Sequence, residues 1–231
     1  MIVARATRVA AAIVVALLAG PGAAPLAKAP DSTRTPLAVA LGPGSVLWIE
    51  GTSTIHAFES RSKDVGIALE RDRATPDPGT AADLLHLIHS AAVRGVTVRV
   101  AVASLRSEKS GLDKNLRKAM NAEQYPDVSF HLDHYDLAPG AANRDTVGIT
   151  AGGSLTIAGQ ERPIRLEAHA YGAESGVWLE GSQALRMSEY GIKPPTMMLG
   201  TLRVGDQVTV RYRLLLVPKG GASSPSPGGK E

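Results

Sequence analysis

The sequence predicts an all-β domain, arranged as a sandwich or a barrel. Apolar residues alternate with polar ones in short runs along most of residues 44–218, which is the period of a strand with one buried face. Turn-forming residues separate these runs, and only two segments have a helical pattern. Closing such a sheet into a barrel would remove its exposed strand edges.

The first 29 residues have the features of a secretory signal peptide. Arg5 and Arg8 precede an unbroken apolar run over residues 9–19, and Ala27-Lys28-Ala29 fits the small-x-small rule for cleavage. The apolar run is shorter than the ~20 residues that a membrane-spanning helix needs. We therefore expect a protein that is periplasmic or secreted after the signal peptide is cleaved.

Cleavage would leave a chain with little net charge. The sequence has 25 Lys and Arg against 22 Asp and Glu, and Arg5, Arg8 and Lys28 lie in the signal peptide, so 25 − 3 leaves 22 basic residues. A neutral chain gives no electrostatic basis for binding nucleic acid. The chain has no cysteine, which excludes disulfides, thiolate metal sites and a lipoprotein anchor at the cleavage site.

Two segments that flank the domain differ from it in composition. Residues 30–43 are rich in Pro, Ala and Gly and read as a linker. Residues 219–231 have no apolar residue larger than Ala apart from prolines, so we expect a disordered tail that cannot bury enough surface to fold. The one domain between them, residues 44–218, is long enough to have its own core.

The strands of this domain follow from period-two alternation. The clearest strand covers residues 96–102, in which every second residue is valine. Ala158-Gly159-Gln160 predicts a hairpin turn, and Val204-Gly205-Asp206 predicts another turn. Further strands are expected at 46–51, 55–60, 65–70, 128–132, 155–157, 164–170, 177–181 and 208–216.

Two segments have the period of a helix instead. Residues 81–92 contain a broad apolar face between Leu84 and Ile88, and residues 112–122 place Leu112 and Leu116 at helical spacing. We expect the second helix to end before Tyr125-Pro126, because the residue before a proline avoids the helical region.

Four motifs occur in a fixed order along the domain. They are G-T-S-T-I-H-A-F at residues 51–58, Y-P-D-V-S-F at 125–130, G-S-L-T-I-A-G at 153–159 and G-D-Q-V at 205–208. Taken together, this set resembles the polyisoprenoid-binding YceI-like family. Each motif alone is weak, whereas their order and spacing are specific and cover nearly all of the domain.

The resemblance implies an eight-stranded antiparallel, lipocalin-like barrel with one or two short helices and an elongated apolar cavity. Members of the family are exported or periplasmic, and some bind a long isoprenoid chain inside the barrel. Residues 71–95 depart from the family pattern as an insertion. The position of the helix over residues 81–92 is therefore open, and at a barrel mouth it would change access to the cavity.

The composition agrees with a hollow interior. An eight-stranded barrel is just wide enough to be filled by side chains or to hold one small ligand. Phe58 and Phe130 are the only phenylalanines, and the smaller Val, Ala and Leu side chains would leave space. An apolar cavity suits an apolar ligand, since each buried methylene contributes ~0.8 kcal/mol.

We expect an exported protein that holds an isoprenoid lipid, a quinone or a similar amphiphile, with no other cofactor. Ser53 and His56 either contact a polar ligand head near a cavity mouth or are structural groups at a strand bend. If Met197-Met198-Leu199 is exposed, it would mark a lip for lipid access and transient contact with a membrane surface. The expected ligand-binding residues are Ser53, His56, Phe58, Phe130, Leu155 and Ile157.

Other functions find less support in the sequence. A packed barrel that acts as a structural or stress-related interaction protein is the main alternative. A hydrolase is less favoured, because the chain has no nucleophile elbow, phosphate loop or dinucleotide fingerprint. His86 and His89 are three residues apart without an HExxH pattern, so a solvated helix face explains them better than a metal site. Asp113 is best explained as a group that caps or orients its helix.

Overall fold

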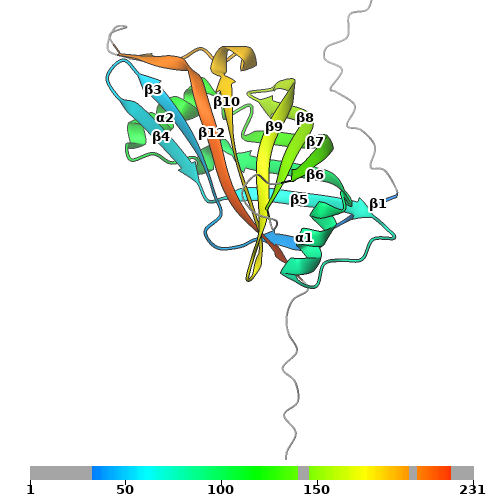
Figure 1. The fold of residues 1–231 in the computed structure, drawn as a ribbon. Helices are drawn as coiled ribbons and strands as arrows, with labels where there is room; N and C mark the ends of the chain where they lie inside the picture. Colours follow the sequence, from blue (N-terminus) through cyan, green and yellow to red (C-terminus); the bar gives the residue numbers. More distant parts are fainter. Residues whose placement is uncertain (1–32, 140–145, 198–201, 220–231) are drawn as a thin grey trace, which may run out of the picture. The chain divides into compact units, whose positions relative to one another are not determined.

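The structure, a computed structural model, describes residues 33–139, 146–197 and 202–219 (Figure 1). The predicted signal peptide lies outside these residues, and so does the predicted tail apart from Lys219. Among the described residues, no helix is both long and apolar enough to cross a membrane.

The described strands form one antiparallel sheet that is strongly curled (Figure 1). Ten strands follow one hydrogen-bonded path in the order β1-β5-β6-β7-β8-β9-β10-β12-β3-β4, and β2 and β11 pair with β12 beside this path. The bounds are β1 (Arg34–Pro36), β2 (Val39–Leu41), β3 (Val46–Ser53), β4 (Ala57–Ser62), β5 (Val65–Asp72), β6 (Val93–Ala101), β7 (Asp127–Pro139), β8 (Thr146–Ile157), β9 (Gln160–Ala173), β10 (Gly176–Arg186), β11 (Thr196–Met197) and β12 (Leu202–Pro218).

The all-β, barrel-like fold is confirmed, but the expected number of eight strands is wrong. The eight strands β3, β5 to β10 and β12 have eight residues or more. The additional strands are short, and β1, β2 and β11 have only two or three residues each. So short a segment carries too little alternation to be recognised from the sequence.

The prediction of a linker over residues 30–43 is corrected in its described part. β1 pairs with β5, and β2 pairs with the end of β12. Leu37 and Val39 are buried in the core. These apolar side chains hold the segment on the sheet, although its content of Pro, Ala and Gly resembles that of a linker.

Two predicted turns have different outcomes. The hairpin between β8 and β9 is confirmed, and Ala158 and Gly159 both have positive φ angles of 49° and 76°, as a tight two-residue hairpin turn requires. The turn predicted at Val204-Gly205-Asp206 is wrong. These residues lie within β12, where the pairing with β3 shifts between Val204 and Val208. Extra residues in one strand form a bulge, which bends the strand without ending it.

Both predicted helices are present. They are α1 (Ala81–His89) and α2 (Ser110–Ala119), and two short 3-10 helices, η1 (Val102–Ser104) and η2 (Met187–Tyr190), accompany them. Thr80 and Asp83 form a capping box at the start of α1, which satisfies backbone N–H groups that a helix leaves unpaired. The inserted segment therefore contains a helix with a defined start.

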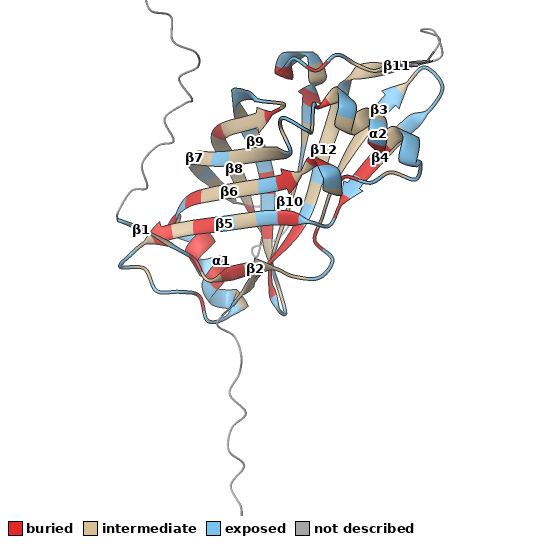
Figure 2. Ribbon diagram, turned by 180° about the vertical axis from the view of Figure 1, so that it is seen from behind, coloured by how far each residue is buried: buried red, intermediate tan, exposed pale blue. Residues whose placement is uncertain are grey.

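The described buried core has three hydrophobic clusters, two of them at opposite ends of the curled sheet and a third around Val65, Val100 and Leu214 of β5, β6 and β12. At one end, Leu84, Leu87 and Ile88 of α1 pack with residues of β9, β10 and β12. At the other end, a second cluster joins Met120 after α2 to Tyr190 of η2. Figure 1 shows α1 and η2, the gold helical turn, at opposite ends of the sheet, and Figure 2 shows the buried residues on α1.

The two ends of the hydrogen-bonded path, at β1 and β4, do not pair with each other. Instead, Arg61 of β4 and Arg106 exchange two backbone hydrogen bonds of 2.7 and 2.8 Å. Beside them, the Ser62 and Ser104 hydroxyls lie 2.7 Å apart. The predicted full closure of the sheet is therefore replaced, in the described residues, by a seam that the segment before α2 bridges.

Candidate ligand-binding cavity

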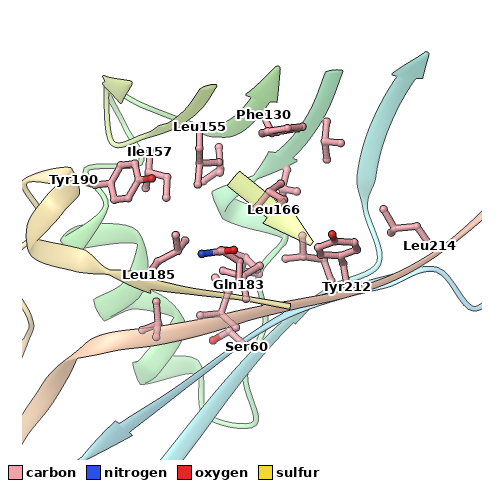
Figure 3. Close-up of a pocket in the computed structure, with 18 of the residues that line it drawn as sticks. Ser60, Phe130, Leu155, Ile157, Leu166, Gln183, Leu185, Tyr190, Tyr212 and Leu214 are labelled. Carbon is pink, nitrogen blue, oxygen red and sulfur yellow. The ribbon is translucent and has the colours of Figure 1, made fainter. Parts of the chain in front are cut away.

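The curled sheet encloses a cavity of about 320 Å³ (Figure 3). Its lining comes from the inner face of the sheet, from α2 and η2 and from Ile88 of α1, and nearly all of the lining side chains are apolar. This volume lies at the lower end of the ~300–1,000 Å³ that is usual for small-molecule sites.

Side chains around the middle of the sheet leave this space open. Ile49, Val98, Leu166 and Leu179 face inward, yet each is only half-buried. In a filled barrel, inward side chains at this level would be fully buried against one another. The hydrophobic clusters at the two ends are packed, and the region between them is hollow.

Three inward aromatic rings lie against glycines of a neighbouring strand, and this arrangement widens the cavity. A Cβ atom placed on Gly51 would lie 2.7 Å from Phe58 Cε1, which is too close for any real contact. The same crowding would arise between Gly153 and Phe130 Cε2 at 2.8 Å, and between Gly181 and Tyr212 Cζ at 2.5 Å. Glycine therefore gives each ring a place beside the backbone.

Two tyrosine hydroxyls are buried at the cavity wall. Tyr212 Oη donates a long hydrogen bond of 3.4 Å to the Glu167 carbonyl oxygen, and burial raises the pKa of Tyr212 to about 12. The Tyr135 hydroxyl lies near the Val93 backbone but makes no hydrogen bond of normal geometry with any residue that the structure describes, and burial raises the pKa of Tyr135 as well. Both phenols stay protonated and neutral near pH 7.

The predicted site residues fall into two groups. Phe58, Phe130, Leu155 and Ile157 all line the cavity, although they come from β4, β7 and β8. Figure 3 shows the last three of them around the same space. Whether they contact a ligand stays a prediction.

Ser53 and His56 do not line the cavity among the described residues. The Ser53 hydroxyl donates to the His56 carbonyl oxygen at 2.8 Å and accepts from the His56 amide at 3.3 Å. The Ser53 amide donates to the same carbonyl oxygen at 2.9 Å. These contacts shape the turn between β3 and β4, and they favour the structural alternative for both residues.

The remaining candidate residues from the sequence either stabilise the fold, lie on the surface or are not described. Asp113 is buried in the first turn of α2 and accepts from the Ser107 amide at 2.8 Å and the Ser107 hydroxyl at 2.6 Å. His86 and His89 are exposed on α1. Met198 and Leu199, and the side chain of Met197, lie outside what the structure describes, so the predicted lip stays a prediction.

Sequence reasoning missed the polar residues of the cavity. Ser60 and Gln183 line it, together with Asn115 and Arg186. Ser60 follows Phe58 by two positions, and Gln183 follows Gly181 by two, so strand period places each on the inner face. The sequence could have indicated these residues, because each is a polar residue at a position that strand alternation places on the inner face.

Ser188 and Asp206 lie outside the lining and connect η2 to the bulge of β12. Asp206 accepts from the Ser188 amide at 2.8 Å and from the Ser188 hydroxyl at 2.6 Å. These bonds hold the Ser188 hydroxyl and the backbone of η2 against the bulge, and Tyr190 of η2 lines the cavity. The G-D-Q-V motif thus has a structural role at this end of the sheet.

Comparisons with known proteins agree with this architecture. The family model described as the YceI-like domain matches residues 50–216, whereas no curated protein matches the sequence. The structure is similar to that of Burkholderia cenocepacia BcnA, with a TM-score of 0.55 and 16% identity over 75% of this chain and 96% of that one. It is also similar to a polyisoprenoid binding domain from Saccharophagus degradans implicated in plant cell wall breakdown, with a TM-score of 0.56 and 12% identity over 79% of this chain and 99% of that one.

Proposed function

The chain belongs to the YceI-like domain family, and from this membership and its cavity we propose that it binds the hydrocarbon chain of an isoprenoid or similar lipid. The observation that carries the proposal is an apolar cavity of about 320 Å³ inside the sheet. Apolar cavities exclude water and accept apolar ligands. The similar domain from Saccharophagus degradans is described as polyisoprenoid binding, which supports the same class of ligand here.

Binding to such a cavity requires no charged group on the ligand. Each methylene transferred from water to the apolar wall contributes ~0.8 kcal/mol, so a chain of several methylenes offsets the loss of free motion on binding. The function we propose is therefore binding rather than catalysis.

We propose further that the protein acts outside the cytoplasm, after cleavage of residues 1–29. The apolar run at residues 9–19 and the small residues before position 30 support this location. Mass spectrometry of the protein purified from cells that express the full chain tests it, since cleavage would give a mature N-terminus at Pro30. An intact N-terminus at Met1 on the exported protein would contradict it.

The binding proposal is tested by native mass spectrometry of the purified protein, followed by organic extraction. The expected result is a complex with a lipid of defined mass. The variant Ala151→Trp places a large side chain inside the cavity and should lower lipid occupancy about tenfold or more, because displacing two methylenes already costs that much.

The matched control for this test is Thr150→Trp. Thr150 neighbours Ala151 on β8 but points to the other face of the sheet, so this variant should keep its lipid. Repeated recovery of empty wild-type protein from lipid-containing cells would contradict the proposal and favour a protein that acts without a ligand.

A further inference from the structure

The Ser60 hydroxyl faces an apolar cavity without a partner of its own. Ser60 is 4% exposed and lines the cavity, and its hydroxyl makes no hydrogen bond with any described residue. Ser62, the next inward residue of β4, differs from it. The Ser62 hydroxyl lies 2.7 Å from that of Ser104 and 3.1 Å from the Asp64 carbonyl oxygen. Within one strand, Ser62 is satisfied by the fold and Ser60 is not.

Gln183 of β10 also has unused hydrogen-bonding capacity. One N–H of its side-chain amide donates to the Ala184 carbonyl oxygen at 3.0 Å. The other N–H and the amide oxygen have no partner among the described residues, although Gln183 lines the same cavity. A glutamine amide can both donate and accept, so Gln183 offers either kind of hydrogen bond.

The strand register brings these two residues to the same level of the sheet. Ser60 pairs with Ile49, Ile49 pairs with Val210, and Val210 pairs with Gln183. Three strand spacings of roughly 4.8 Å separate the two residues along this row, and the curl of the sheet turns both toward the same cavity. Figure 3 shows Ser60 and Gln183 among the side chains that line the cavity.

Ser60 is buried and Gln183 is half-buried, and both line the cavity. Their unused hydrogen-bonding capacity therefore faces the space inside an otherwise apolar wall. A polar group gains free energy when it finds a hydrogen-bond partner in apolar surroundings, and an oxygen of the ligand is such a partner. The ligand group must be uncharged, because Arg186 is the only charged residue in the described lining. Arg186 is exposed at the last residue of β10, and an ion held away from it would lose its hydration without a counter-charge.

We infer that Ser60 and Gln183 each offer a hydrogen bond to an uncharged oxygen of the ligand, a carbonyl or a hydroxyl, inside the sheet rather than at its rim. The inference rests on the proposed function, because it assigns a polar contact to the same cavity. The ligand class is thereby narrowed to neutral amphiphiles whose oxygen enters the cavity together with the chain.

The test compares three fifteen-carbon isoprenoids of similar size that differ at one end. Farnesol has a hydroxyl, farnesal has a carbonyl and β-farnesene has no oxygen. Each displaces the neutral fluorophore N-phenyl-1-naphthylamine from the purified full protein. We expect the oxygen-bearing chain to bind about three- to tenfold more tightly than β-farnesene, as one or two added hydrogen bonds provide. Comparing farnesol with farnesal shows whether a hydroxyl or a carbonyl is preferred.

The double variant Ser60→Ala with Gln183→Leu should remove this preference and leave the affinity for β-farnesene unchanged or higher. The matched control combines Ser182→Ala with Gln207→Leu, the same two substitutions at exposed positions of β10 and β12. The control should retain the preference seen in the wild type.

The outcomes separate the inference from the proposed function. Equal binding of all three chains to the wild type overturns the inference and leaves lipid binding intact, and this comparison needs no variant to fold. A preference that survives in the folded double variant overturns the assignment to Ser60 and Gln183. Failure of every chain to bind overturns both proposals.

Discussion

At the scale of single residues, inward glycines determine how much of the cavity is free. Gly51, Gly153 and Gly181 allow Phe58, Phe130 and Tyr212 to rest against the neighbouring backbone. A side chain at any of these glycines would push the ring toward the space that we assign to the ligand. The width of the cavity therefore depends on residues that contribute no side chain to its wall.

Gly51→Ala tests this relation. The added methyl group would collide with the Phe58 ring, and such overpacking costs about 1–3 kcal/mol. We expect a loss of that size in the free energy of unfolding, measured by denaturant titration, together with weaker binding of N-phenyl-1-naphthylamine.

The control is Gly66→Ala on β5. Gly66 is exposed, and a Cβ atom there would make only an ordinary contact of 3.5 Å with the Arg99 carbonyl oxygen. This variant should be neutral or slightly stabilising. Equal stability of the two variants would refute the role of Gly51.

The apolar lining residues could be predicted from the sequence, whereas the polar ones could not. Phe58, Phe130 and Leu155 occupy inward positions of regular strands, so alternation alone places them. Ser60 and Gln183 obey the same alternation, but their importance depends on which hydroxyls and amides find partners. Partners such as Ser104, which satisfies Ser62, come from distant parts of the chain.

At the scale of secondary structure, α2 is fixed at its start by one buried carboxylate. Asp113 receives two hydrogen bonds from Ser107 and lies 3.8 Å from Arg106. The Ser107 hydroxyl holds the pKa of Asp113 below its ordinary 3.8, although burial acts in the opposite direction. The segment before α2 is thereby attached to the helix, and Leu112, Leu116 and Ala119 of this helix line the cavity.

Asp113→Asn should therefore lower stability in a pH-dependent way. Near neutral pH we expect a loss of about 1.5–3 kcal/mol, because hydrogen bonds to a charged group are weakened. The folded pKa lies below the unfolded pKa, so the wild-type advantage is complete above the unfolded value near 3.8. It is lost as the pH falls through the lower folded pKa.

Thermal or urea unfolding of both proteins across this pH range measures the effect. Asp133→Asn, at an exposed position of β7, is the control and should change stability little at any pH. A difference between wild type and Asp113→Asn that is constant down to the lowest pH would contradict the linkage.

The sequence predicts the two helices and the longer strands, but it does not predict where α1 lies. The apolar face of α1 shows that the helix must be buried on one side. α1 packs against residues that include Leu216 of β12 and Val177 of β10. Which residues it contacts depends on how distant strands are paired. The strands β1 and β2 were missed for the same reason, because the burial of Leu37 and Val39 depends on core residues from distant parts of the chain.

At the scale of the whole molecule, the described sheet has a seam along β4, the strand at one end of the hydrogen-bonded path. β4 pairs with β3 on one side and has no continuous partner strand on the other. On that open side of β4, Arg61 and Arg106 form an isolated antiparallel bridge with two backbone hydrogen bonds. An open strand edge is prone to local opening and to pairing with other chains. The sequence does not predict the seam, because it does not specify how the two ends of the sheet approach each other.

Arg106→Pro should weaken this seam. Proline has no N–H group and cannot donate the 2.8 Å hydrogen bond to the Arg61 carbonyl oxygen. We expect faster hydrogen exchange at the Arg61 amide and along β4, with little change in β8 and β9.

The control Arg106→Ala removes the same side chain, and with it the contact with Asp113, but keeps the N–H. It should preserve the exchange protection of Arg61. Identical exchange in the two variants would show that the backbone bridge does not hold the seam.

The division of the core into packed ends and a hollow middle has a thermodynamic consequence. Without a ligand, the side chains around the cavity lack neighbouring atoms on one side, so the empty protein loses part of its van der Waals stabilisation. A lipid that occupies the void and binds only the native state raises the melting temperature by mass action. The melting temperature of a preparation would then report how much of it is loaded, and delipidation during purification would register as a loss of heat resistance.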